Sequence, residues 1–176
     1  MNDDVYGIKK WGNDILEILE NGNIGLKNPF HPDNSPADLI KIIKSLNERG
    51  ISCPVLLRVT DYLAFRIKQI NNSFFRAIRE IRYKGEYKGV FPVKVNQQAQ
   101  VIDRIVEFGK EFDFGLEVGS KPELLIALAH DLSANSTIIC NGIKDREFIH
   151  LAILSIKIGF KTILVLESPR ELDLII

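Results

Sequence analysis

Cysteine is scarce in this sequence of 176 residues, which contains only Cys53 and Cys140. Neither belongs to a Cys-x-x-Cys pair or a Cys/His cluster, which argues against a disulfide framework and the common zinc sites. The three histidines also show no spacing typical of metal ligands or of a catalytic triad. We therefore expect two reduced thiols in the core beside apolar strands, and no metal site.

The chain also lacks net charge and long apolar runs. Its 23 Lys and Arg residues balance 23 Asp and Glu residues, which argues against a nucleic-acid partner held by bulk charge. No apolar run approaches the roughly 20 residues of a membrane span. The N-terminus lacks the basic start and apolar block of a signal peptide. We expect a cytoplasmic protein with no membrane partner.

What is present suits a globular protein, since 45% of the residues are hydrophobic and 26% are charged. In the first 50 residues, two alternating stretches within residues 14–27 flank Asn21-Gly22, a pair typical of a tight hairpin turn. After a loop rich in Pro and Asn, Ser35 is expected to cap a helix that Gly50 ends. Residues 1–50 are thus predicted to form an N-terminal segment of hairpin, loop and helix.

From residue 51 to residue 176, apolar strands alternate with amphipathic helices, which indicates α/β structure with parallel strands. The strands are expected at residues 53–59, 89–95, 113–119, 137–142 and 161–167. The last four begin 24 residues apart, and such short, even units favour a TIM-type (β/α)₈ barrel, of which these would be about the first five βα units. A doubly wound open sheet is the alternative.

Five strands would not close a barrel, which needs about 250 residues in all. A half-built barrel leaves two unpaired strand edges and an exposed apolar face. The sequence is therefore expected to be the N-terminal portion of a longer protein, with the remaining barrel strands absent.

Lys94 lies within the apolar run Val90–Val95, although lysine is rarely buried without a partner. Groups at the carboxyl ends of barrel strands project into the active-site mouth. A lysine withdrawn from water there becomes a nucleophilic amine, able to form a Schiff base with a carbonyl substrate or with pyridoxal phosphate. The alternative is an ion pair with Glu117 or Glu167. The segment Cys140–Gly142 ends the fourth expected strand and would face the same mouth.

Three blocks carry a family resemblance: GVFPVKVNQQAQVIDRIVEFG, DFGLEVGSKPELLIALA and IICNGIKDREFIHLAI. With the upstream pieces YGIKKWG and PVLLRVTDYLAFRIKQINNSFFRAI, they closely resemble the biosynthetic arginine decarboxylases, over nearly the whole chain and in the family's order. These are pyridoxal-phosphate enzymes of the alanine-racemase-like, fold type III group.

The resemblance implies roles for two residues. Lys94 matches the lysine that holds the cofactor as a Schiff base, and is thus both the catalytic and a cofactor-binding candidate. Glu117 matches an acidic residue that lies near this linkage in related decarboxylases. Phe91 departs from the family, which commonly has Tyr there, so a ring is kept and a hydroxyl is lost.

The resemblance further implies decarboxylation of L-arginine to agmatine, with a magnesium requirement, a role in polyamine (spermidine) synthesis, and homo-oligomers whose neighbouring subunits complete each active site. The family's phosphate-binding loop, pyridine-nitrogen partner and cysteine acid lie on later strands and in a C-terminal β domain, so the chain alone is expected to be inactive. Two alternatives remain: a non-catalytic protein that binds or regulates an intact decarboxylase, and a decarboxylase for another basic amino acid.

Overall fold

The computed structural model describes residues 5–176, which form two compact units, one up to Phe65 and one from Arg66 onward. The domain limit expected after residue 50 falls inside the first unit. No helix between residues 5 and 176 is both long enough and apolar enough to cross a membrane.

The first unit contains the predicted hairpin. After helix α1 (Ile8–Trp11), strands β1 (Leu16–Ile18) and β2 (Ile24–Leu26) pair antiparallel. Gly22 in the turn has a φ of 82°, a conformation that glycine adopts at little cost. A third strand, β3 (Ala37–Asp38), pairs with β2 and was not predicted, because two residues carry no periodic signal.

Helix α2 (Leu39–Glu48) is capped by Asp38, so the prediction that Ser35 caps this helix is wrong. The backbone before α2 is extended because it pairs with β2. One carboxylate oxygen of Asp38 accepts hydrogen bonds from the backbone N–H groups of Ile40 and Lys41, at 2.9 and 3.2 Å. The side-chain amide of Asn23, which also donates to this carboxylate, has the largest effect in lowering the pKa of Asp38 to about 2, and Asn21 and the two backbone bonds add to it.

The segment 53–59 forms no strand, although its apolar composition predicted one. A strand needs a neighbour for its backbone hydrogen bonds, and neither sheet within the described residues includes this segment. Cys53 is consequently exposed rather than in the core. The amphipathic segment that follows forms helix α3 (Thr60–Glu80), as predicted.

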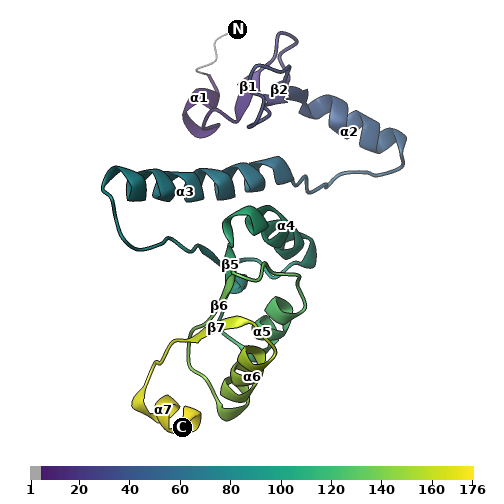
Figure 1. Cartoon of the computed structure of the whole chain (residues 1–176). Coiled ribbons are helices and arrows are strands. Elements are labelled where there is room, and N and C mark those ends of the chain that lie inside the picture. Colours follow the sequence, from purple (N-terminus) through teal and green to yellow (C-terminus); the bar gives the residue numbers. More distant parts are fainter. Residues whose placement is uncertain (1–4) are drawn as a thin grey trace. The chain divides into compact units, whose positions relative to one another are not determined.

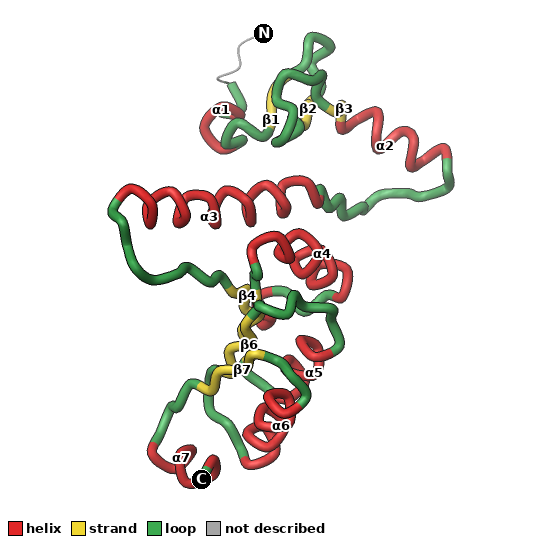
Figure 2. Tube along the Cα trace, viewed as in Figure 1, coloured by secondary structure: helices red, strands yellow, loops and turns green. Residues whose placement is uncertain are grey.

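The second unit contains a parallel sheet in which each strand is followed by a helix (Figure 2). The strands are β4 (Val90–Pro92), β5 (Gly115–Val118), β6 (Thr137–Cys140) and β7 (Lys161–Leu164). The helices are α4 (Ala99–Gly109), α5 (Lys121–Leu128), α6 (Arg146–Lys157) and α7 (Pro169–Ile175). The described residues thus hold four parallel strands rather than the five expected.

The strand order separates the two candidate folds. It runs β4-β5-β6-β7 without reversal, whereas a doubly wound sheet reverses its order at a switch point. Because βα crossovers are right-handed, an unreversed order places successive helices on one face of the sheet. Figure 1 shows α4, α5 and α6 on the same side of the strands. The sheet is therefore part of a TIM-type barrel, as predicted.

The core of this unit lies between the sheet and these helices. Leu116 and Val118 of β5 and Ile138 and Cys140 of β6 are all 0% exposed. The helices α4, α5 and α6 contribute side chains to this core that are no more than 1% exposed: Ile102, Ile105, Leu124, Ala127, Ile149 and Ala152. Burying each large side chain contributes about 1.5–3 kcal/mol, so this layer supplies most of the unit's apolar stabilisation.

The opposite side of the sheet, here called the open face, carries one row of residues in register: Pro92, Glu117, Ile139 and Ile163. Side chains alternate along a strand, so this row points away from the layer that contains Leu116. Ile163 on the edge strand β7 is 52% exposed. The open face therefore combines apolar side chains with one carboxylate.

Candidate cofactor site

Lys94 lies just beyond the carboxyl end of β4, in a 3₁₀ turn that spans Val93–Val95. The strand ends at Pro92, so the strand predicted at residues 89–95 stops before the lysine. Val93 is 0% exposed and Val95 is 69% exposed, so these two valines do not share one side of a strand. A turn of three residues rotates each successive side chain by about 120° and replaces the two-residue period of a strand.

The structure brings the two predicted site residues together. Lys94 Nζ lies 3.4 Å from Glu117 Oε1, so the ion pair considered as an alternative is present. Glu167 instead accepts a hydrogen bond from the backbone N–H of Gly142 at 3.2 Å. The Lys94 side chain is 60% exposed, which corrects the expectation that the amine is withdrawn from water.

Glu117 is well buried, since the residue is 8% exposed. Its Oε1 faces Lys94, while its Oε2 is buried without a hydrogen-bond partner among the described residues. A buried carboxylate oxygen without a partner is costly, and native structures rarely keep one without a reason. The pair therefore offers a primary amino group that solvent can reach, beside an acceptor with unused capacity. This arrangement fits a carbonyl cofactor linked to Lys94.

A second carboxylate connects the turn that contains Lys94 to helix α5. Glu123 Oε1 accepts a hydrogen bond from Gln97 Nε2 at 3.3 Å, and its Oε2 accepts one from the backbone N–H of Gly119 at 2.7 Å. The hydroxyl of Ser120 accepts from the backbone N–H of Glu123, so Ser120 caps the start of α5. The start of α5 is thus bonded to the connection that follows β4.

A buried ion pair connects the ends of β6 and β7. Lys144 Nζ lies 3.0 Å from Glu171 Oε2, and the two side chains are 0% and 4% exposed. Glu171 also accepts the backbone N–H groups of Glu167 and Lys144, each at 2.8 Å. These backbone bonds, followed by the lysine, lower the pKa of Glu171. Lys144 donates as well to the carbonyl of Gly142.

Sequence reasoning missed the links made by Gln97, Glu123, Lys144 and Glu171. One signal was available, because Ser-x-x-Glu opens both α5 (Ser120 to Glu123) and α7 (Ser168 to Glu171). This pattern predicts one helix-capping bond and does not show that the second oxygen reaches the preceding connection. Nothing in the sequence distinguished the buried Lys144 from an ordinary surface lysine.

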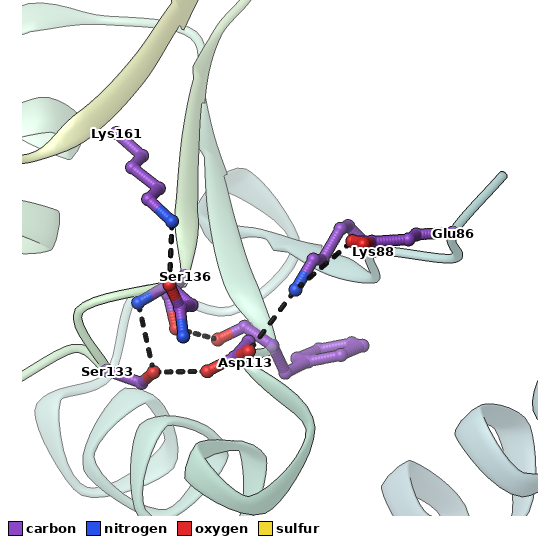
Figure 3. Close-up of polar contacts among 8 residues, drawn as sticks. Glu86, Lys88, Asp113, Ser133, Ser136 and Lys161 are labelled. Atoms are coloured by element: carbon purple, nitrogen blue, oxygen red, sulfur yellow. Dashed lines mark hydrogen bonds and ion pairs between the residues drawn. The ribbon is translucent and has the colours of Figure 1, made fainter.

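The amino ends of the strands carry a different polar cluster (Figure 3). Asp113 lies between Lys88 Nζ, at 3.2 Å, and the hydroxyl of Ser133, which donates to it. Both contacts lower the pKa of Asp113, and Ser133 has the larger effect. Lys161 donates to Asn135 at 2.7 Å. Barrel active sites lie at the other end of the strands, so this cluster joins connections and supports the fold.

The chain is similar to curated proteins named biosynthetic arginine decarboxylase. It is 46% identical to the one from Prochlorococcus marinus strain MIT 9312 over 171 residues, which cover 97% of this chain and 26% of that relative. It is 44% identical to the one from Gloeobacter violaceus over 173 residues, covering 98% and 27%. The resemblance seen in the sequence is confirmed, and the chain spans about a quarter of the length of these relatives.

The chain is also similar in structure to solved decarboxylases. The biosynthetic arginine decarboxylase from Campylobacter jejuni superposes with a TM-score of 0.87 at 34% identity, over 97% of this chain and 28% of that one. A diaminopimelate decarboxylase from M. jannaschi superposes with a TM-score of 0.61 at 22% identity, over 93% and 32%, which shows a shared fold. Residues 67–176 match the family model described as pyridoxal-dependent decarboxylase, pyridoxal binding domain, and the chain belongs to this family.

Proposed function

We propose that this chain supplies the cofactor-linking lysine, Lys94, of a pyridoxal-phosphate-dependent enzyme that decarboxylates L-arginine to agmatine and CO₂. The observation that carries the proposal is the approach of the Lys94 amine to Glu117 at the carboxyl end of the sheet. The similarity to arginine decarboxylases over 97% of the chain supports the choice of substrate. Nothing in the described side chains alone selects arginine over another basic amino acid.

The residues present suit this role. Lys94 Nζ is a primary amine that solvent can reach, as attack on an aldehyde requires, and Glu117 holds it by one carboxylate oxygen. When bound, pyridoxal phosphate would accept the electron pair released as the α-carboxylate leaves. Lys94 would hold the cofactor through Nζ, and when not linked to it this amine could hold or move a proton beside the reacting carbon. Glu117 would orient the amine.

The remaining parts of the proposal concern the organisation of the whole protein and the parts of the active site that lie outside this chain. We propose that residues 51–176 form the first part of a barrel that later strands complete, and that a C-terminal β domain follows. The phosphate-binding loop, the partner of the pyridine nitrogen and the general acid would come from those parts and from a neighbouring subunit of a homo-oligomer. The proposal includes a Mg²⁺ requirement and a cytoplasmic role in polyamine synthesis.

Trapping tests the proposal directly. The protein as its gene encodes it is incubated with pyridoxal phosphate, reduced with borohydride, digested and mapped. We expect the label on Lys94. Lys94→Ala should remove the label and lower the decarboxylation of arginine by at least about 10²-fold, the smaller effect expected for loss of a proton-handling group.

Substrate choice is checked in parallel by measuring the products formed from arginine, ornithine and lysine. Lys41→Ala, which changes an exposed lysine on α2, is the control for loss of an amine. A parent protein labelled at another lysine, or not at all, would refute the role of Lys94.

A further inference from the structure

The carboxyl ends of the strands share a repeated contact. In each case a carboxylate near the start of a helix binds a side chain from the preceding βα unit. The three pairs are Gln97–Glu123 at 3.3 Å, Lys121–Asp145 at 2.8 Å and Lys144–Glu171 at 3.0 Å. These contacts join β4–α4, β5–α5, β6–α6 and β7–α7 in series around one end of the sheet.

The first of these pairs lies next to the reactive lysine. Gln97 follows Lys94 by three residues in a tightly bonded turn, where the N–H of Asn96 donates to the carbonyl of Val93 at 3.1 Å. The side chain of Asn96 in turn accepts the N–H of Gln98 at 3.1 Å. A contact made by Gln97 therefore restrains the turn that carries Lys94.

Glu123 is well placed to provide that restraint. The residue is 8% exposed, and the N–H of Gly119 holds its second oxygen at 2.7 Å. Gly119 follows Glu117 by two residues, just beyond β5. One rigid carboxylate thus bonds both to the turn that carries Lys94 and to the strand end that carries Glu117. The Lys94 side chain is 60% exposed, so packing alone does not fix it.

We infer that Glu123 is a positioning residue for Lys94, and that it acts through Gln97 to hold the amine beside Glu117. This inference rests on the proposed function, because it concerns how readily Lys94 reacts with pyridoxal phosphate. Glu123 does not touch the amine. Its contribution is to limit the orientations of the turn, so that Nζ stays at the distance seen from Glu117.

Gln97→Ala is the sharpest test. It removes the bond from Gln97 to Glu123 and leaves the bond from Gly119 to Glu123, so α5 keeps its cap. Gln97 is exposed, and the variant should fold with an unchanged melting temperature. The readouts are the rate of borohydride-trapped labelling at Lys94 and the dissociation constant for pyridoxal phosphate. We expect the labelling rate to fall about tenfold, the effect of losing one hydrogen bond to a charged group.

Lys121→Ala is the matched control, because it removes the ion pairs of Lys121 with Asp145 and Glu147, which do not involve the turn that carries Lys94, and it should leave labelling unchanged. Gln97→Glu places a second carboxylate against Glu123 and should slow labelling further, with partial recovery in high salt. Glu123→Gln keeps one oxygen to accept the N–H of Gly119, and the side-chain amide of Gln97 can rotate so that its oxygen accepts from the new amide. The labelling rate of this variant should therefore stay close to that of the parent protein.

The outcomes separate the two proposals. If the parent protein is labelled at Lys94 and Gln97→Ala is labelled at the same rate, Glu123 has no positioning role, while the proposed function stands. Equal slowing by Gln97→Ala and Lys121→Ala would also overturn the inference, since any loosening of the connections would then suffice. An unlabelled parent protein would overturn the proposed function and this inference with it.

Discussion

Cys53 and Cys140 differ in whether water reaches them, and that difference controls their reactivity. Cys140 is 0% exposed at the end of β6, and burial raises its pKa to about 11 because the thiolate would lose its hydration. Cys53 lies in an exposed connection. The nucleophile in alkylation is the thiolate, so burial protects Cys140 both by excluding the reagent and by keeping the thiol protonated.

We expect an alkylating reagent at pH 8 to modify Cys53 within minutes and to leave Cys140 unmodified until the second unit unfolds. Mass spectrometry of digests taken over time measures both sites in one sample. Adding denaturant should bring the two rates together. Equal rates in the folded protein would contradict the burial of Cys140.

Glu171 shows how one carboxylate makes stability depend on pH. Its pKa in the folded state is lowered, chiefly by the backbone N–H of Glu167 and then by that of Lys144. A lowered folded-state pKa means that the ionised form stabilises the fold. The contribution is fully present above the ordinary value of 4.5 and is lost as the pH falls through the lowered folded value.

Glu171→Gln should therefore be less stable than the parent at pH 7, with a smaller further loss of stability below pH 4.5. Urea unfolding measured between pH 3 and pH 7 gives both quantities. Glu48→Gln, at an exposed position on α2, is the control and should follow the parent curve. A Glu171→Gln curve parallel to that of the parent would show that this carboxylate does not carry the acid sensitivity.

At the scale of the element, the close pairing of β5 and β6 depends on a glycine. A Cβ added at Gly115 would lie 1.9 Å from the carbonyl oxygen of Thr137, a backbone atom that cannot move without shifting the strand. Gly119, just beyond the other end of β5, has no such neighbour, because the nearest atom to an added Cβ would be Glu123 Oε2 at 3.6 Å. The two positions therefore form a matched pair.

Gly115→Ala should lower the free energy of unfolding of the second unit by about 1–3 kcal/mol, the usual range for overpacking. Gly119→Ala should change its stability much less. Chemical unfolding followed by circular dichroism compares the two variants. Similar stability for both would mean that β5 and β6 can separate slightly without cost.

Elements with a strong local pattern were predicted from the sequence, and those that depend on a distant partner were not. Helix α3 follows its apolar positions at steps of three and four, and the hairpin follows Asn21-Gly22. The segment 53–59 has the composition of a strand but no neighbour to pair with in either described sheet. Helix α2 begins after Asp38 and not after Ser35, because residues 37 and 38 are extended and pair with β2.

In the candidate site, too, residues with a local signal were predicted and contacts with distant partners were not. Lys94 and Glu117 were identified from local motifs and a family resemblance, and the structure places them 3.4 Å apart. The contact between Gln97 and Glu123 was missed because it joins residues 26 apart, and a helix-capping pattern carries no information about such a distant partner. The exposure of Lys94 was also missed, since its apolar neighbours suggested a strand where the chain forms a turn.

At the scale of the whole molecule, the two sides of the sheet differ sharply. Ile138 faces the helices and is 0% exposed, whereas Ile163 on the open face is 52% exposed. In a complete barrel the inner face is filled by layers of side chains from alternate strands. If the proposed barrel organisation holds, the open face becomes interior once later strands are present, and Ile163 becomes a core residue.

The cost of Ile163→Ala should therefore depend on how much of the protein is present. In the 176-residue chain studied alone, the variant should lose less than about 1 kcal/mol, because half of the side chain already meets water. In a protein that includes the later strands, it should lose about 2–5 kcal/mol, the range for a buried isoleucine. Ile138→Ala should cost that larger amount in both proteins, because its helix layer lies within this chain. Equal, small effects of Ile163→Ala in the two proteins would mean that later strands do not cover the open face, and the barrel proposal would then be wrong.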